Sequence, residues 1–255
     1  MESDHYQPMA ILPVLSKVYE RLLEYVELER LFQDTASGYR KGHSTTTVLL
    51  RIRDDIIQAM KKGELTLIAF ADFSKAFDTV DYSIVIRKLH AIGLSKSALL
   101  WILSYLSNCQ QFVQVNDKQS CLKDVLFGVP QGSVLGPVIF NLYANDLQDC
   151  LKDGSTCFQY ADDTTVLLHA PLKDLKDCVN RMNNILQSIE SWAADSNLLL
   201  NETKTKQMLV TTRQMSRVHD LGDYTPPLSL KNKLIDRVDR FRLLGTLLCE
   251  DLKWT

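Results

Sequence analysis

The chain has 255 residues, of which 45% are hydrophobic, and a formal net charge of −2. This length allows a sizeable core, either in one large domain or in two lobes. The charge gives no support to a nucleic-acid partner, although a local basic surface is enough to bind phosphate. No uncharged apolar run approaches the roughly 20 residues that span a bilayer, so we expect no membrane association.

The six cysteines show no C-x-x-C spacing of the kind that zinc and redox sites use. Most lie in apolar patterns, which indicates buried, reduced thiols in an intracellular protein. Residues 1–15 lack the basic start and long apolar stretch of a signal peptide.

A helix is predicted between Ser44 and Gly63, because apolar residues recur there at helical spacing between a capping residue and a stop signal. The apolar run at residues 65–71 follows and ends at Asp72. This pattern predicts a buried strand with a carboxylate at its end.

The middle of the chain alternates between helical and extended patterns. Asp81 and Ser95 are predicted to cap two further helices. Short strands are expected at residues 110–115 and 125–129, and the next helix is expected to start after Ser133. The irregular alternation of elements favours a mixed α/β class.

The pattern in the second half predicts a β-hairpin with carboxylates at its tip. Residues 157–161 and 164–169 are two β-rich runs joined by Asp162 and Asp163. A long helix is predicted to begin near Pro171. The remainder is expected to contain a strand-like stretch (residues 198–212) and a loop-like stretch (residues 218–230).

Three aspartates at strand ends and turns suggest a metal site. Hard divalent cations such as Mg²⁺ bind carboxylate oxygens and leave room for water and phosphate. Two such ions can activate a hydroxyl and stabilise a leaving oxygen in an in-line displacement. Taken alone, an Asp-Asp turn is more often ordinary hairpin chemistry, and Asp72 is a similarly weak signal.

Three motifs make this interpretation specific. Residues 70–78 (FADFSKAFD) resemble the first catalytic motif of reverse transcriptases, residues 128–137 (GVPQGSVLGP) the second, and residues 160–163 (YADD) the third. Shorter motifs of the family are resembled at residues 12–17, 38–44, 201–205, 244–245 and 252–254. The sequences of these motifs are most similar to those of enzymes of non-LTR (LINE-like) retrotransposons, and the resemblance covers nearly the whole chain.

The resemblance implies an α+β right-hand polymerase core. Residues 1–62 would be the N-terminal part of the fingers. Residues 63–255 would be the palm with the remaining finger elements, with a helix-backed antiparallel sheet carrying the catalytic hairpin. The thumb is expected to be absent or truncated. The resemblance is also compatible with a nuclear location.

The resemblance implies that Asp72, Asp162 and Asp163 are catalytic. They would bind two Mg²⁺ ions, or Mn²⁺ in their place, together with the backbone carbonyl of Phe73. Lys204 would donate a proton to the leaving pyrophosphate or balance its charge, although the neighbouring Lys206 makes this assignment ambiguous.

The substrate pocket is implied on the same grounds. Phe77, with Ala76 beside it, would exclude a ribose 2′-hydroxyl, although spacing alone favours a core aromatic. Gln131 and Gly132 would line the nucleotide pocket, where the residues by themselves indicate only a strand-to-helix turn. The fingers would contribute triphosphate contacts through two basic side chains, Arg40 and Lys41.

The implied activity is RNA-directed DNA synthesis, with an RNA template, a DNA primer and deoxynucleoside triphosphates as partners. Residues 35–38 (TASG) differ from the usual family motif, which has a Gln and an aromatic residue before the Gly. This difference affects the expected template contacts more than the expected catalysis. Two alternatives are an inactive retroelement-derived nucleic-acid-binding fragment and a two-metal nucleotidyl cyclase. The motif at residues 128–137 disfavours the cyclase.

Overall fold

The computed structural model describes residues 31–130, 132–133, 135–151 and 154–252. Contacts divide the chain into two compact units. The first unit contains residues 1–32, 75–145 and 196–198, and the second contains residues 33–74, 146–195 and 199–255. The predicted division into fingers and palm at residues 62 and 63 stays a prediction.

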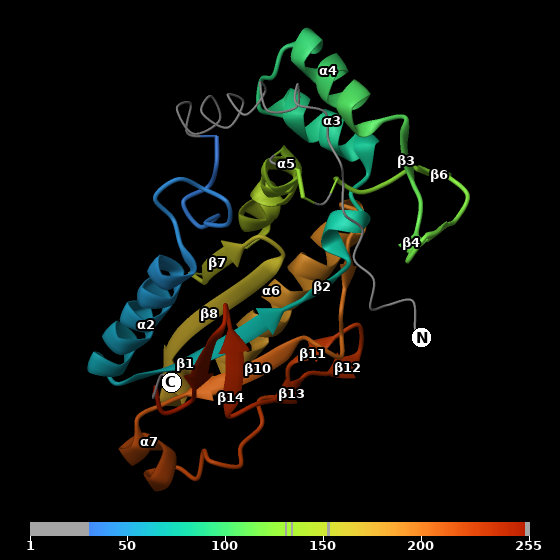
Figure 1. The fold of residues 1–255 in the computed structure, drawn as a ribbon. Coiled ribbons are helices and arrows are strands. Elements are labelled where there is room, and N and C mark those ends of the chain that lie inside the picture. The colour runs from blue at the N-terminus through green and yellow to red at the C-terminus, as the bar shows by residue number, and fades with distance from the viewer. Residues whose placement is uncertain (1–30, 131, 134, 152–153, 253–255) are drawn as a thin grey trace. The chain divides into compact units, whose positions relative to one another are not determined.

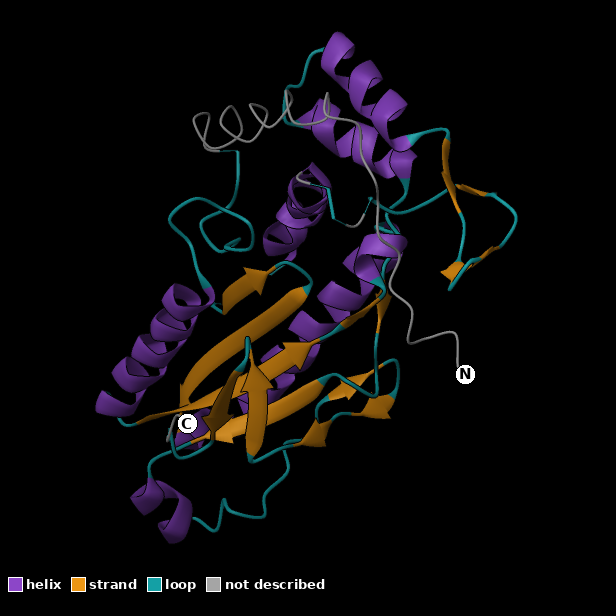
Figure 2. Cartoon of the chain, in the orientation of Figure 1, coloured by secondary structure: helices purple, strands orange, loops and turns teal. Residues whose placement is uncertain are grey.

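The second unit is built around a five-stranded sheet with the strand order β13-β10-β1-β8-β7 (Figures 1 and 2). Four strands are antiparallel to their neighbours, and only β13 runs parallel to β10. The strands are β1 (Glu64–Ala71), β7 (Thr156–Tyr160), β8 (Asp163–Pro171), β10 (Lys206–Val210) and β13 (Asp236–Arg237). The predicted strand before Asp72 and the predicted hairpin are therefore both present.

Helix α2 (Thr45–Lys61) packs against one face of this sheet. Its N-terminus is fixed by a reciprocal capping box between Ser44 and Thr47, and Gly63 follows its end with a φ of +75°. Buried residues of the helix, including Ile52 and Ile56, join a core formed by the sheet and a C-terminal hairpin. The helix predicted from Ser44 to Gly63 is confirmed.

Helix α6 (Leu175–Asp195) contacts β1 and β8 and carries a continuous buried stripe. A short 3-10 turn, η5 (Leu172–Asp174), separates it from the Pro171 at which the long helix was expected to begin. Strand β1 is buried along seven of its eight residues, because apolar side chains lie on both faces of the sheet. The backbone of β1 is therefore held rigidly up to Asp72.

Small elements complete the second unit. The segment after β10 forms a short helix where only strand and loop were expected, because Thr212 accepts a hydrogen bond from the Met215 N–H and caps it. The small elements of this unit are β2 (Phe73–Ser74), β9 (Leu199–Leu200), α7 (Arg213–Val218), β11 (Ser229–Leu230), β12 (Lys233–Leu234), β14 (Arg240–Leu243) and β15 (Thr246–Cys249). The short 3-10 helix η4 (Asn145–Cys150) links the two units in sequence.

The first unit packs α3 (Tyr82–Ala91) against both α4 (Lys96–Leu106) and α5 (Leu135–Ala144). Asp81 and Ser95 cap α3 and α4, as the sequence predicts. A 3-10 turn, η3 (Ala76–Asp78), precedes α3. Two ribbon-like pairs lie between α4 and α5: β3 (Cys109–Gln111) with β6 (Lys123–Val125), and β4 (Gln114–Val115) with β5 (Lys118–Gln119).

The prediction of a strand at residues 125–129 is wrong. Strand β6 ends at Val125, and the backbone beyond it turns so that the Gly128 and Val129 N–H groups donate to Val80 and Phe77. Its apolar side chains predicted a strand, but these hydrogen bonds fix a different path.

None of the described helices is both long and apolar enough to cross a membrane.

Candidate active site

The three aspartates come from two neighbouring strands. Asp72 follows the last residue of β1, Asp162 lies in the turn between β7 and β8, and Asp163 is the first residue of β8. The register pairs Ala71 with Thr164, so the end of β1 lies beside the start of β8. Strand pairing alone therefore brings the three carboxylates to one end of the sheet.

The hairpin tip is a two-residue turn. Tyr160 pairs with Asp163 across the hairpin, and Ala161 adopts a φ of +56°. A positive φ is uncommon for a residue with a Cβ and is maintained only where the surroundings fix it. The tip therefore holds the backbone of Asp162 and Asp163 in a defined conformation at the end of the sheet.

The carboxylates oppose one another electrostatically. Partial burial, followed by the charges of Asp162 and Asp72, raises the pKa of Asp163 to about 6, even though the residue as a whole is exposed to solvent. Burial also raises the pKa of Asp72 and that of Asp162, and the nearby Lys204 ammonium offsets part of each shift. Each shift disfavours the charged carboxylate, chiefly through burial, and for Asp72 and Asp163 also through a neighbouring negative charge.

A cluster of carboxylates whose charged forms are disfavoured fits a divalent cation. Asp72 Oδ2 is buried and accepts no hydrogen bond within the described chain. Among the described residues, no group of three or more His, Cys, Asp or Glu side chains is arranged so that it could hold a metal ion. Mg²⁺ commonly binds through only one or two carboxylates and completes its shell with water and substrate phosphate. The donor set therefore fits an open Mg²⁺ site better than a closed structural one.

The turn at residues 201–205 is docked on the backbone of Asp72. The Asn201 N–H donates to the Asp72 carbonyl at 2.8 Å, and the Asp72 N–H donates to Thr205 Oγ1 at 3.4 Å. Asn201 Oδ1 in turn accepts from the N–H groups of Thr203 and Lys204 at 3.1 and 3.2 Å, which makes an Asx turn. This turn fixes where Lys204 leaves the backbone.

The two lysines of this segment lie in different places. Lys204 Nζ lies 3.9 Å from Asp72 Oδ2, and its side chain is largely exposed. Lys206 Nζ instead donates to Asp236 Oδ2 at 2.7 Å, across the β10–β13 pair. Lys204 is therefore the lysine that the structure places beside the aspartates.

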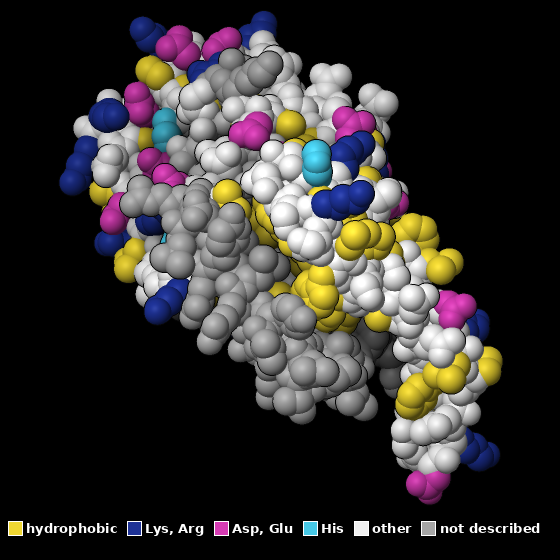
Figure 3. All heavy atoms as spheres, turned by 90° about the horizontal axis from the view of Figure 1, so that it is seen from above, with side chains coloured by type: hydrophobic (Ala, Val, Ile, Leu, Met, Phe, Trp, Pro, Cys, Tyr) yellow, Lys and Arg dark blue, Asp and Glu magenta, His cyan; other side chains and the backbone are white. Residues whose placement is uncertain are grey.

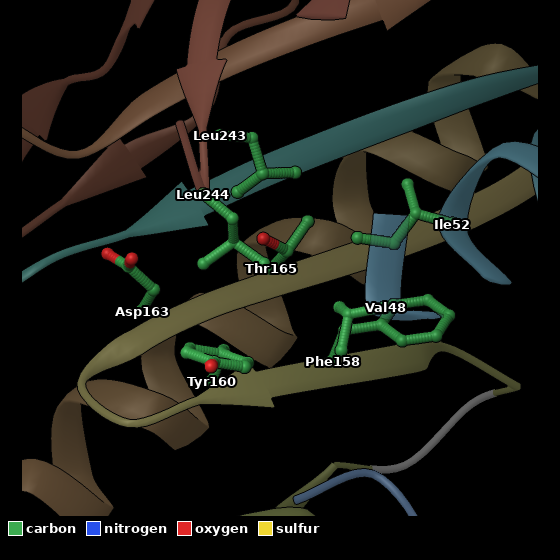
Figure 4. A pocket seen from close by; sticks show the side chains of 8 residues that line it. All are labelled: Val48, Ile52, Phe158, Tyr160, Asp163, Thr165, Leu243 and Leu244. Atoms are coloured by element: carbon green, nitrogen blue, oxygen red, sulfur yellow. The ribbon is translucent and has the colours of Figure 1, made fainter. Parts of the chain in front are cut away.

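A shallow apolar hollow lies next to Asp163 (Figure 4). Figure 4 shows Asp163 at one end of it, with Leu244 from the tip of the β14–β15 hairpin alongside and Tyr160 on β7 below. Low-polarity walls contribute to the burial that raises the pKa of Asp163. The remaining lining residues are Val48, Ile52, Phe158, Thr165 and Leu243.

Arg40 and Lys41 occur in a loop that precedes α2. Arg40 is half-buried, and its Nη1 donates to the carbonyls of Gln33 and Ala36 at 2.9 and 2.8 Å. At least part of this guanidinium therefore braces the loop itself. Lys41 is exposed. Their contacts with a triphosphate stay a prediction.

The first unit contains the residues expected around the sugar. The Phe77 ring stacks on Phe140 with centroids 4.4 Å apart, and Ala76 is buried. Gly128 has a φ of +90°, and a Cβ there would lie 2.9 Å from the Asp78 backbone, so only glycine fits this approach. The segment after Asp72 and the segment before α5 are thus joined within one unit.

Three expected positions complete the set. Gly132 is exposed, with a φ of +84°, in the turn before α5, whereas Gln131 lies outside the described residues. The Phe73 side chain is buried edge-on against Trp192, with centroids 6.0 Å apart. The expected use of the Phe73 carbonyl as a metal ligand stays a prediction.

Asn201 and Thr205 hold the backbone of Asp72 in place, and the family motif at residues 201–205 by itself implies no role for them. The detectable signal was an Asn at the start of a polar turn, a position that favours an Asx turn. What the turn contacts depends on a partner more than 120 residues away in the chain, and local sequence carries no information about it.

The sequence model of the family described as "Reverse transcriptase (RNA-dependent DNA polymerase)" matches residues 2–248. The chain belongs to the reverse transcriptase family. Polymerases of this family generally use a divalent metal ion, in agreement with the carboxylate cluster. Within the family it is of the LINE-like, non-LTR retrotransposon type, as its relatives show.

Two *Drosophila melanogaster* proteins are among these relatives. The RNA-directed DNA polymerase from mobile element jockey is 27% identical over 99% of this chain, and the probable RNA-directed DNA polymerase from transposon BS is 28% identical over 96%. The chain spans only 28% and 27% of their respective lengths.

Solved telomerase structures share the fold of this reverse transcriptase chain. The match to telomerase from Candida albicans, in complex with a fragment of telomeric RNA, covers 95% of this chain and 38% of the telomerase chain, with a TM-score of 0.62 and 17% identity. Apo telomerase from *Candida tropicalis* matches 94% of the chain and 44% of its own, with a TM-score of 0.60 and 12% identity. The expected α+β fingers and palm architecture is therefore confirmed.

Proposed function

We propose that this chain is the polymerising core of a retrotransposon RNA-directed DNA polymerase. It adds deoxynucleoside triphosphates to the 3′-hydroxyl of a DNA primer paired with an RNA template. The observation that carries the proposal is the convergence of Asp72, Asp162 and Asp163 at one end of the sheet, where their charged forms are disfavoured. Such a site suits a reaction in which metal ions and phosphate oxygens gather.

The three aspartates are proposed to hold two Mg²⁺ ions, with Mn²⁺ as a substitute. When bound, the ions would supply Lewis-acid activation of the primer hydroxyl and charge stabilisation of the phosphates. The new bond joins the primer 3′-oxygen to the α-phosphorus, and the bond from that phosphorus to the bridging oxygen breaks. Pyrophosphate leaves, and Lys204, 3.9 Å from Asp72, is placed to donate a proton to it or to balance its charge.

The other predicted residues position the substrate. Phe77 is proposed to exclude a 2′-hydroxyl, and its stack on Phe140 would fix the ring against rotation. Ala76, Gln131 and Gly132 are proposed to line the same nucleotide pocket. Positively charged side chains from the fingers, Arg40 and Lys41, are proposed to contact the triphosphate.

Primer extension tests the proposal. The longest reading frame that contains this chain is assayed on poly(rA)/oligo(dT) with Mg²⁺ and dTTP. We expect extension by the wild type and a loss of at least about a thousandfold in Asp162→Asn, because an amide cannot replace an anionic metal ligand. The matched control is Asp223→Asn, which changes an exposed aspartate for which no role is proposed.

Absence of extension by the wild type would overturn the proposal and favour an inactive nucleic-acid-binding fragment. Retained extension in Asp162→Asn would show that this aspartate is not part of the catalytic site. Cyclic nucleotide formation from ATP or GTP in place of extension would favour a cyclase. Intracellular and nuclear location stays a prediction.

A further inference from the structure

A loop at residues 33–43, here called the finger loop, extends the edge of the catalytic sheet. The Ser37 N–H donates to the Gln159 carbonyl at 2.8 Å, and the Gln159 N–H donates to the Thr35 carbonyl at 3.1 Å. Ala36 forms a parallel bridge with Gln159. Figure 1 shows this loop, in blue, beside β7. The loop is thus hydrogen-bonded to the strand that leads into the hairpin tip.

The closest approach is at Gly38. A Cβ on this residue would lie 2.4 Å from the Ala161 backbone nitrogen, a distance that no side chain can occupy. Ala161 directly precedes Asp162 in the chain. Glycine therefore allows the loop backbone to touch the tip of the catalytic hairpin, and the next residue, Tyr39, emerges at that point.

The finger loop is braced from inside. Arg40 donates to the carbonyls of Gln33 and Ala36, and His43 Nδ1 lies 3.2 Å from Ser37 Oγ. Tyr39 itself has a φ of +56°. A left-handed conformation is costly for a bulky residue and occurs preferentially where a site requires a particular orientation. The braced loop therefore holds the Tyr39 backbone in a conformation that this residue rarely adopts.

The Tyr39 ring is outside the hydrophobic core. The residue is 53% exposed, whereas Phe70 and Phe158 of the core are below 5%. Burial and then the charges of Asp162 and Tyr160 raise the pKa of the Tyr39 hydroxyl, so the phenol lies within electrostatic reach of the aspartate site. Packing in the core therefore does not account for the position of this ring.

We propose that the Tyr39 ring is a stacking platform for a nucleobase at the active site, placed there by the contact of Gly38 with Ala161. The inference rests on the proposed function. Aromatic rings stack on any base because every base has a π-face, and protein sites use this to hold strands without reading sequence. Phosphate is a poor ligand for the ring itself, because the negative face of an aromatic π-system repels an anion.

The nucleobase has two sources, the incoming nucleotide and the template strand, and two binding measurements distinguish them. The first is the dissociation constant of the next correct dNTP for enzyme held on a dideoxy-terminated primer–template. The second is the dissociation constant of a fluorescent single-stranded RNA, measured by anisotropy without Mg²⁺. Both report binding independently of turnover.

We expect Tyr39→Ala to raise one of these constants about tenfold, the size of the loss of one base–aromatic stack. Tyr39→Phe keeps the ring and is expected to stay within about twofold of the wild type, as stacking and not the hydroxyl carries the contact. The control Leu234→Ala removes a comparably exposed apolar side chain, 68% exposed on β12, and is expected to change neither constant.

Two results would overturn the inference. One is wild-type affinity for both ligands in Tyr39→Ala, and the other is an equal loss in Tyr39→Phe and Tyr39→Ala. If Tyr39→Ala unfolds at a lower temperature than the wild type, Tyr39→Leu, which keeps an apolar side chain, replaces it in the comparison. A wild-type enzyme that binds neither ligand would overturn the proposed function as well, so the two failures are distinguishable.

Discussion

Two hairpins of similar local character differ in what surrounds them. The β7–β8 hairpin, called the catalytic hairpin after its proposed role, is flanked by β1 on one side and by the finger loop on the other. The ribbon between α4 and α5, here called the arm (residues 109–127), forms only two-stranded pairs among the described residues. Residues 164–168 of the catalytic hairpin are buried, whereas all three residues of β3 are exposed or partly exposed.

The difference shows that strand signals do not by themselves make a rigid platform. An isolated two-stranded ribbon is marginally stable in water, and neighbouring strands or helices are needed to hold it. Figure 3 shows hydrophobic side chains open to solvent on the face seen from above. The exposed large hydrophobic residues of the arm are Phe112, Val113, Val115, Leu122, Leu126 and Phe127. We therefore expect functions that need fixed geometry to lie in the catalytic hairpin. Substitutions in the arm should change stability little.

The largest expected difference is in core truncation. Leu167 on β8 is fully buried, and Leu167→Ala should lower the free energy of unfolding by about 2–5 kcal/mol through lost burial and a residual cavity. The same change in the arm, Leu122→Ala, removes a side chain that is 60% exposed and should cost less than about 0.5 kcal/mol.

Urea denaturation of the two variants measures this contrast. Equal losses would show that the arm is packed against something in solution, and the distinction between the two hairpins would then fail.

The next effect concerns the attachment of the finger loop. Gly38→Ala forces a Cβ against the Ala161 nitrogen and should cost about 1–3 kcal/mol, because backbone on both sides must move. Polymerase activity should fall with it, since the displaced tip carries Asp162.

Gly222→Ala is the matched control for this change. A Cβ at Gly222 meets nothing within 4 Å, and its φ is not in the left-handed region. Thermal unfolding and primer extension of the two variants should therefore differ, and matching results would argue against a tight contact between loop and tip.

A smaller effect is expected from the charge at the tip. Because the pKa of Asp163 is raised to about 6, the folded state binds its proton more tightly than the unfolded chain does. Without divalent ions, stability from this group should therefore fall as pH rises from about 4 to about 6. At pH 7 in EDTA, Asp163→Asn should stabilise the chain by at most about 1 kcal/mol, after allowance for solvent screening.

Added Mg²⁺ should raise the unfolding temperature of the wild type and remove this advantage of the Asn variant, because the wild-type site offers the ion one more anionic ligand. An Asp163→Asn variant that is less stable than the wild type at pH 7 in EDTA would contradict the sign. Asp223→Asn, which changes an exposed aspartate in the loop before β11, serves as the charge control.

The smallest effect is expected in the arm itself. Phe112→Ser removes a ring that is 45% exposed and should change the free energy of unfolding by less than about 0.5 kcal/mol. Limited proteolysis should cut the arm before it cuts β7 or β8, because a ribbon with few buried contacts opens locally at low cost. Earlier cleavage in the catalytic hairpin would reverse the comparison.

Local signals in the sequence determined much of the fold. Helix α2 was predictable because its capping box and apolar spacing are all contained in one short segment. The same is true of the catalytic hairpin, where two β-rich runs flank an Asp-Asp pair. The prediction of a strand at residues 125–129 failed, because the path of this backbone depends on hydrogen bonds with Phe77 and Val80, which are distant in sequence.

By itself, the sequence determined the family and predicted the three aspartates as the catalytic site, since motifs in the right order are a property of the chain alone. Only the tertiary structure decided that Lys204 and not Lys206 lies beside Asp72, and that Gly38 touches the hairpin tip. The physical reason is that the charge and size of a side chain depend only on the residue at that position. Which partner each one meets is set by strand register and turn geometry between segments far apart in the chain.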